Sequence, residues 1–330
     1  MRIERFDPGA DTESLRACFE MTQDGWPVDH PKSPAWPFES FAGKWISGFG
    51  VFPQQCWLAT DDDDRAVGGY LLRLPQQENA DRASCELVVA PSRRRSGIGT
   101  ALLQHCADRA RQASRSWLSS HADDGSPGAS FAAAVGARSG IAQVQRILTI
   151  GGSLPGRLAA LRADAEPRAA GYALLSWSGP TPDEHLDAVA RMYNAMADAP
   201  RDDGVQPMAW DADRVRRVDR EAAEHGLRTH STVARERATG EIAALTEICT
   251  DDGTPGWVFQ MDTVVLPAHR GRRLGMLVKV AMLESLPDRG VSAERILTGN
   301  AGANEHMIAI NEQLGFEVAS THRSWELPLS

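Results

Sequence analysis

The stretch ELVVAPSRRRSGIG at residues 86–99 aligns without gaps on DTVVLPAHRGRRLG at residues 262–275. Both copies begin with an acidic residue, continue through a pair of valines to a proline, and end in a turn rich in arginine and glycine. The flanking sequence corresponds as well, since VGARS around Gly136 matches LGFEV around Gly315. A repeat of this length is a whole domain and not a short solenoid unit, so the sequence predicts a tandem duplication.

The repeat and one interrupting segment predict the domain boundaries. The segment GGSLPGRLAALRADAEPRAA, rich in glycine, proline, alanine and charge, is typical of a linker with one short helix. We therefore expect a first domain at 1–152, a linker at 153–168 and a second domain at 169–330. Each domain is expected to run strand, two helices, hairpin strands, a further strand, helix, strand, helix, strand. This order predicts an α/β (α+β) fold, with a mixed, mostly antiparallel sheet flanked by helices in each domain.

Composition excludes several classes of protein. The chain has 330 residues, 42% hydrophobic and 24% charged, which is the balance of a soluble globular protein. No apolar run approaches the roughly 18 residues of a membrane span, and MRIERFDPGA lacks the apolar core of a secretory signal, so we expect a cytoplasmic protein without a membrane partner. The five scattered cysteines favour reduced core thiols over disulfides or a metal site. A net charge of -9 disfavours a protein that coats nucleic acid.

The repeated stretch also predicts an anion site. A strand that turns through arginine and glycine directly into a helix presents free backbone N–H groups at the positive end of that helix. Gly97 and Gly99 remove side chains where a phosphate would approach, and Arg94 and Arg95 add charge-assisted hydrogen bonds. A diphosphate is the expected ligand. The alternative, that these residues are only turn chemistry and solvated charge, is weakened by the second copy.

The segment RRSGIG at residues 94–99 resembles the Q/R-x-x-G-x-G/A acyl-CoA loop of the Gcn5-related N-acetyltransferase (GNAT) superfamily, and NAGANEHMIAINEQLGF at 300–316 resembles its later helix and closing LGF. The similarity spans most of both halves. The resemblance implies two splayed central strands with pantetheine between them. It also implies an acyl-CoA cosubstrate, with acetyl-CoA as the first candidate, and no metal. The implied cofactor-binding residues are Val88, Val89, Arg94, Arg95, Ser96, Gly97, Ile98, Gly99 and Thr100 in the first half, and Val264, Val265, Arg270, Gly271, Arg272, Arg273, Leu274, Gly275 and Asn304 in the second.

Two positions depart from the pattern of that family. Arg273 replaces the first glycine of the motif, so the backbone there must differ or rely on Gly271 and Gly275. Asn311 stands where many members have a tyrosine that protonates the leaving thiolate. That proton must then come from water or another residue, or is not needed. Asn304 suits an N-cap of the last helix as well as a cofactor contact.

An amine nucleophile needs a general base, because a primary amine is mostly protonated at neutral pH. Glu86 and Asp262 are the symmetric candidates, since each lies two residues before the paired valines. The alternative is that both are ordinary strand carboxylates paired with an arginine. The candidate catalytic residues are therefore Asp262, Glu86 and Asn311.

The leading hypothesis is an acyl-CoA-dependent N-acyltransferase that acetylates a primary amine of a small molecule by direct attack. We expect one half to be catalytic and the other degenerate or structural; the asparagines of the closing helix favour the second half, although the first has the better glycine loop. One alternative is an aminoacyl-tRNA-dependent transferase, with tRNA as acyl donor facing arginines at 214–220. Another is a non-catalytic CoA-binding module. The amine and the oligomeric state stay open.

Overall fold

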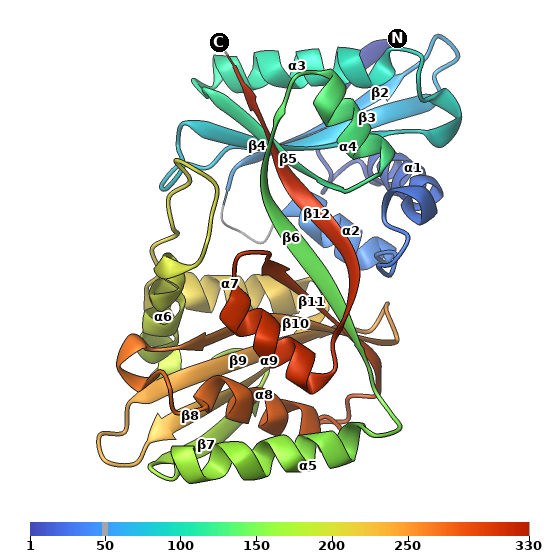
Figure 1. Ribbon diagram of the computed structural model, residues 1–330. Helices are drawn as coiled ribbons and strands as arrows, with labels where there is room; N and C mark the ends of the chain where they lie inside the picture. Colours follow the sequence, from blue (N-terminus) through green and yellow to red (C-terminus); the bar gives the residue numbers. More distant parts are fainter. Residues whose placement is uncertain (48–51, 330) are drawn as a thin grey trace. The chain divides into compact units, whose positions relative to one another are not determined.

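The computed structural model describes residues 1–47 and 52–329, and both halves follow the predicted order of elements (Figure 1). In each half a strand and two helices precede an antiparallel group of three strands, which is followed by helix, strand, helix and strand. The predicted α/β class and the mostly antiparallel sheet are confirmed. The elements of the first half are β1 (Arg2–Phe6), α1 (Thr12–Asp29), α2 (Phe38–Ile46), β2 (Gln54–Thr60), β3 (Ala66–Arg73), β4 (Arg82–Val89), α3 (Ile98–Gln112), β5 (Trp117–Asp123), α4 (Pro127–Ala134) and β6 (Arg138–Thr149).

The second half begins with an additional helix. This helix, α5, falls in the predicted linker and packs against α8, because Leu154 and Leu158 join the same hydrophobic cluster as Met276 and Val280. The elements are α5 (Leu154–Ala165), β7 (Tyr172–Ser178), α6 (Leu186–Asn194), α7 (Ala212–Glu224), β8 (Leu227–Glu236), β9 (Ile242–Asp251), β10 (Gly256–Val265), α8 (Leu274–Glu284), β11 (Ala293–Ala301), α9 (Glu305–Leu314) and β12 (Glu317–Pro328).

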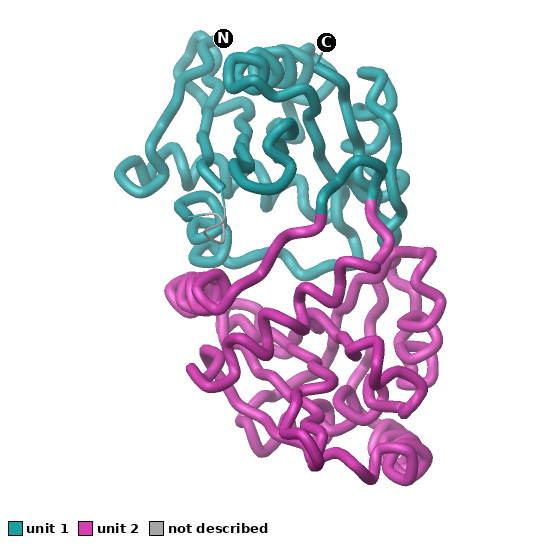
Figure 2. The backbone as a smooth tube through the Cα atoms, turned by 90° about the vertical axis from the view of Figure 1, so that its left-hand side faces the viewer, with its two compact units in different colours: residues 1–143, 202–206, 320–330 teal, residues 144–201, 207–319 magenta. Residues whose placement is uncertain are grey.

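The chain divides into two compact units, and each unit is made of more than one segment of the sequence (Figure 2). Unit 1 contains 1–143, 202–206 and 320–330, and unit 2 contains 144–201 and 207–319. In unit 1 the C-terminal strand β12 pairs antiparallel with β5. The predicted boundaries 1–152 and 169–330 are continuous ranges, whereas β6 and β12 both pass from one unit to the other.

Helices cover both faces of the sheet in unit 1. Tyr70 and Leu72 on β3 pack with α3 residues, whereas Leu71 between them packs with residues of α1 and α2. This alternation follows from the period of two in a strand. The five cysteines are free and buried, as expected of core thiols. Within 1–47 and 52–329, the helices are all too short or too polar to cross a membrane.

Candidate active site

The two repeated loops have the same backbone conformation. In the first loop Arg95 (φ 64°) and Gly97 (φ 85°) lie in the left-handed region. At the matching positions of the second loop, Gly271 has φ 79° and Arg273 has φ 60°. Each loop therefore has one glycine and one strained arginine, in exchanged order, and the left-handed arginine costs roughly 1–2 kcal/mol. The second loop keeps its course by relying on Gly271, one of the two outcomes expected from the sequence.

Each loop ends at an open helix N-terminus. Neither α3 nor α8 is capped by a side chain, and neither has an acidic residue in its first turn. The first-turn N–H groups are therefore available to an anion, which is what a CoA diphosphate requires. A methyl group on Gly99 would lie 3.5 Å from the Phe131 ring, and one on Gly275 would lie 3.4 Å from Ile310. Because these two glycines have no side chain, α3 can pack closely against α4, and α8 against α9.

The first arginine of each loop supports the loop itself. Arg94 donates from Nε to the carbonyl of Val89 (3.3 Å) and makes a two-pronged ion pair with Asp29 (3.0 and 2.6 Å). Arg270 repeats the arrangement with the last carbonyl of β10 (3.3 Å) and with Asp198 (2.7 Å). Each guanidinium group holds the end of a strand against an acidic residue from an earlier part of the same half, Asp29 at the end of α1 or Asp198 shortly after α6. Their contribution to an anion site is to position the loop.

The remaining arginines differ between the halves. Arg95 makes no hydrogen bond or ion pair with any residue that the structure describes. Arg272 donates to the Tyr172 hydroxyl, and Arg273 pairs with Asp164 on α5 at 2.9 Å. The first loop therefore keeps a guanidinium free for a phosphate, whereas the side chains of the second loop are held by the protein.

The central strands diverge in both halves, as the resemblance implies. The parallel pairing of β4 with β5 joins only 82–84 to 117–119, although β4 continues to Val89. Likewise β10 pairs with β11 only through 256–259, although it continues to Val265. The resemblance to the GNAT superfamily implies that backbone amides at 87–89 and 263–265 polarise the thioester carbonyl. Both sets of amides lie beyond the paired part of their strand.

A β-bulge lies on β10 at this divergence. Gln260 pairs with Ile248 and Thr263 with Thr246 on β9, so Met261 and Asp262 both lie opposite Glu247. The extra residue of a bulge is left unpaired and the strand bends. Met261 is 53% exposed as a result, although it lies in mid-strand. In the first half β4 pairs with β3 without interruption from residue 84 to 89.

Glu247 faces the bulge from a buried hydrogen-bond network. The Tyr193 hydroxyl donates to its Oε2 at 2.5 Å and the Ser231 hydroxyl donates to its Oε1 at 2.9 Å. Glu247 is only 8% exposed, and burial raises its pKa to about 7, against the opposing effect of the Tyr193 hydrogen bond and with the help of the Asp262 charge. Burial also raises the pKa of Asp262. A carboxyl group of this pKa both takes up and releases a proton at neutral pH.

Sequence reasoning missed Glu247 and Tyr193. The available signal was a lone acidic residue within the apolar strand IAALTEICT at 242–250, where alternation alone does not explain a charge. Nothing in the sequence marks Tyr193 as its partner, because the two residues come from different elements.

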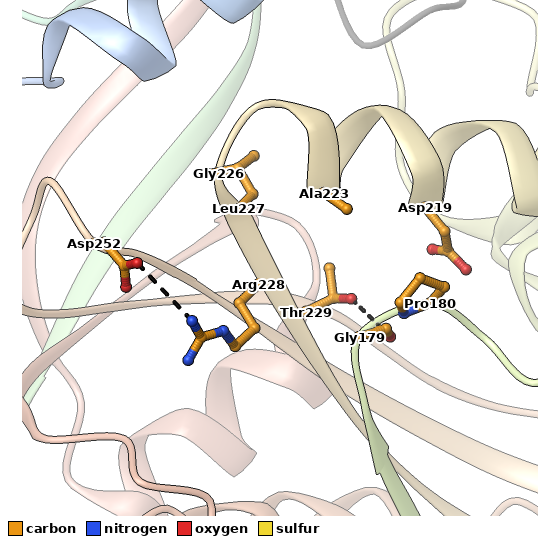
Figure 3. A pocket seen from close by; sticks show the side chains of 9 residues that line it. All are labelled: Gly179, Pro180, Asp219, Ala223, Gly226, Leu227, Arg228, Thr229 and Asp252. Carbon is orange, nitrogen blue, oxygen red and sulfur yellow. Dashed lines mark hydrogen bonds and ion pairs between the residues drawn. The ribbon is translucent and has the colours of Figure 1, made fainter.

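A pocket of about 270 Å³ lies near this network, between the end of α7 and the first residues of β8 (Figure 3). Asp219 lines it, and the charge of this residue contributes to the raised pKa of Glu247. Thr229 also lines it and lies two residues before Ser231 on β8, about 7 Å along the strand. The lining residues are Gly179, Pro180, Asp219, Ala223, Gly226, Leu227, Arg228, Thr229 and Asp252.

Glu86, the other proposed base, is ion-paired. Lys44 lies 2.7 Å and Arg73 2.6 Å from its carboxylate oxygens. Burial opposes ionisation, but these two cations outweigh it and lower the pKa of Glu86 to about 2. Its side chain is 40% exposed, so solvent screens part of this attraction. The geometry supports the alternative of a paired strand carboxylate.

The asparagines around the last helix have distinct roles. Asn304 caps α9 by accepting from the N–H of Met307 (3.2 Å), as expected. Asn311 is fully buried and donates from Nδ2 to Oδ1 of Asn300 (2.6 Å). Its own Oδ1 has no partner among the described residues. An amide has no proton to give to a thiolate at neutral pH, so Asn311 can orient a ligand but does not replace the absent tyrosine.

His269, next to the second loop, is a structural residue in this geometry. Its Nδ1 lies 2.7 Å from the Tyr172 hydroxyl and its Nε2 lies 3.3 Å from Glu241. Both ring nitrogens are therefore occupied by contacts within the protein.

The paired loops, open helix ends and diverging strands define an acyl-CoA-binding class of fold, and comparison with known proteins specifies it. Residues 15–132 match the acetyltransferase (GNAT) family. A tandem GNAT protein from the clavulanic acid biosynthesis pathway is similar over 100% of this chain and 98% of its own, with 27% identity and a TM-score of 0.83. Residues 15–132 therefore match an acetyltransferase (GNAT) domain, and the chain as a whole is similar in fold to a tandem GNAT protein.

Other solved structures share the fold at lower identity. A GCN5-related N-acetyltransferase from Sphaerobacter thermophilus has 16% identity and a TM-score of 0.66, with 99% of this chain and 95% of that chain covered. A fungal glucosamine N-acetyltransferase region has 13% identity and a TM-score of 0.67, with 99% and 38% covered. No curated protein matches the chain.

Proposed function

We propose that the protein transfers the acyl group of acetyl-CoA to a primary amine of a small molecule, and that the second half performs this reaction. The observation that carries the proposal is the bulge of β10, which sets Met261 and Asp262 opposite Glu247. It combines a freed strand amide with a proton acceptor of suitable pKa at the point where the central strands diverge.

The chain's own residues supply binding and orientation. In this proposal the open N-terminus of α8 binds the diphosphate of acetyl-CoA, and Arg270 holds the loop that leads to it. The amides freed by the bulge are suited to donate to the thioester carbonyl oxygen, where negative charge develops during attack. This assignment moves the polarising amides from 263–265, expected from the family, to Met261 and Asp262.

Glu247 serves as the proton acceptor. The amine arrives as an ammonium ion and gives one proton to the Glu247 carboxylate, after which its lone pair forms the new C–N bond. The C–S bond breaks, and the thiolate leaves with that electron pair. The second proton lost by the nitrogen neutralises the thiolate, so Asn311 need not act as an acid. Tyr193 and Ser231 hold the carboxylate in place through their hydrogen bonds.

The tRNA alternative loses support from the basic cluster on α7. Arg214 is 4% exposed and donates to the carbonyl of Ala209 (2.6 Å). Arg216 is paired with Asp213 (2.8 Å) and Asp183 (3.2 Å). A surface that tracks a phosphate backbone needs free cations, and these two side chains are engaged within the protein.

The test is thiol release from acetyl-CoA with a panel of small primary amines, for wild type and for Glu247→Gln. General-base catalysis contributes about 10²–10⁴-fold, so a loss of kcat of that size is expected. Glu317→Gln, an exposed carboxylate on β12, is the matched control and should leave kcat unchanged. Full activity of the Glu247→Gln variant would show that Glu247 is not the general base. No thiol release from wild type with any amine would overturn the function itself.

A further inference from the structure

Unit 1 contains a cluster of titratable side chains that the proposed function does not use. We define the histidine cluster as His30, His121, Asp123 and His322, all within unit 1. On β5, His121 and Asp123 are two residues apart and so share a face of the sheet. His322 on β12 pairs directly with Asp123, which places its side chain on that same face. The His121 and His322 rings lie 6.2 Å apart.

The cluster lies at the divergence of the central strands of the first half. The parallel pairing of β4 with β5 ends where Ser84 meets Ser119. Two residues further along each strand are Glu86 and His121, so these residues occupy matching positions across the widening gap. The Glu86 charge acts on the His121 ring, in agreement with this placement. Part of the His121 side chain reaches solvent, so a substrate can contact it, although the atoms packed around the ring are enough to make burial the largest influence on its pKa.

The charges around His121 favour its neutral form. Burial lowers its pKa first, and the Lys44 ammonium on α2 adds to this, while Glu86 on β4 and Asp202 partly oppose it. Burial first, and then the charges of His121 and His30, lower the pKa of His322 on β12, while Asp123 and Asp124 partly oppose this shift. Both imidazoles are therefore uncharged at neutral pH, and an uncharged imidazole accepts a proton.

A buried carboxylate completes the cluster. Asp123 is 6% exposed, and its Oδ1 lies 3.4 Å from Nδ1 of His30. Its Oδ2 has no partner among the residues described. A buried carboxylate with a free oxygen stabilises an imidazolium beside it, which favours passage of a proton from His121 toward His322 and His30. In the second half, the strand β11 has Asn300 after its paired residues, a side chain that does not titrate.

We propose that the first half is a second acyl-transfer centre, in which His121 accepts the proton of a primary amine that attacks an acyl-CoA bound at the first loop. This goes beyond the proposed function, which assigns transfer to the second half. The open N-terminus of α3 and the unpaired Arg95 supply the anion site. Glu86 is held ionised by Lys44 and Arg73 and does not take the proton.

The ammonium gives one proton to His121, and the freed lone pair forms a C–N bond with the acyl carbon. The C–S bond breaks, the thiolate leaves with its electron pair, and it takes the second proton lost by nitrogen. His121 passes its proton through His322 to solvent.

The experiment uses the full chain with Glu247→Gln as background, so that only the first half can contribute a base. Thiol release from acetyl-CoA is measured against pH, with an amine that the wild type acetylates. The expected result is residual turnover that falls at least tenfold when His121→Gln is added, with loss of the acidic limb below about pH 6.5. His306→Gln, an exposed histidine on α9, is the matched control and leaves the residual rate and its pH profile unchanged.

Two results overturn the inference. One is a Glu247→Gln protein with no turnover above buffer, which refutes a second centre and leaves the proposed function intact. The other is an unchanged rate and pH profile after His121→Gln. A Glu247→Gln protein with full activity that His121→Gln abolishes refutes instead the proposed role of the second half. His121→Asn is measured alongside, and thermal unfolding of each variant shows whether a lost rate reflects lost structure.

Discussion

Replacing the buried carboxyl of Glu247 should stabilise the protein while it removes activity. Burial raises the pKa of Glu247 from 4.5 to about 7, so the native state holds a proton there that the unfolded chain has released. Stability contributed by this group is present below pH 4.5, is lost as pH rises toward 7, and stays lost above that. At about 1.4 kcal/mol per pKa unit, the penalty above pH 7 is about 3 kcal/mol.

Glu247→Gln removes that penalty because glutamine carries no charge and accepts the Tyr193 hydrogen bond with its own oxygen. We expect the free energy of unfolding to exceed that of wild type by about 3 kcal/mol at pH 8 and to match it at pH 4.5. Urea unfolding at the two pH values measures this difference, with Glu317→Gln as the control. Titrating groups that do not interact with Glu247 contribute equally to both proteins and cancel, whereas Asp262 is coupled to its charge and adds to the difference. A variant that is no more stable than wild type at pH 8 would refute a strained, functional carboxylate at this site.

Three further experiments, which use four substitutions, test separate parts of the structure. Gly97→Ala places a side chain at φ 85° with no atom within 4 Å of the new methyl group, so the free energy of unfolding in urea should fall by about 1 kcal/mol from backbone strain alone. In the control Gly156→Ala, within α5 and at an ordinary φ, the free energy of unfolding should rise by a similar amount. Glu86→Gln should lower the unfolding temperature at pH 7, and this difference should disappear as pH falls from 4.5 toward 2, because the depressed pKa makes the ionised form the stabilising one. Lys279→Met should raise the unfolding temperature most at pH 6 and progressively less toward pH 10.5, because burial lowers the pKa of that 1%-exposed lysine from 10.5 to about 7; an equal gain at both pH values would contradict this reasoning.

The repeated loops show which parts of the structure can be predicted from local sequence. Their valine pairs, prolines and glycines predicted two strand–turn–helix units, and both are present. Arg273 stands in the second loop where Gly97 stands in the first, and from the sequence alone this difference left the backbone course of the second loop undecided. Only the structure shows that Gly271 provides the left-handed glycine there.

Charge pairing was harder to predict than the elements. Arg94 was expected to bind phosphate, but it pairs with Asp29 at the end of α1. Glu86 was expected to be a base or a paired carboxylate, and the choice depended on whether Lys44 from α2 reached it. A sequence states which charges exist, whereas their separation depends on how distant elements pack.

By itself, therefore, the sequence determined the duplication, the order of strands and helices and the two arginine- and glycine-rich loops that resemble the GNAT motif, because each of these is written in residues that lie close together along the chain. Tertiary structure alone decided the pairing of β12 with β5, the bulge that sets Asp262 opposite Glu247, and the placement of His121 where the Glu86 charge acts on it. The physical reason is that strand pairing, burial and pKa depend on contacts between residues far apart in the chain, whose periodicity is compatible with more than one partner.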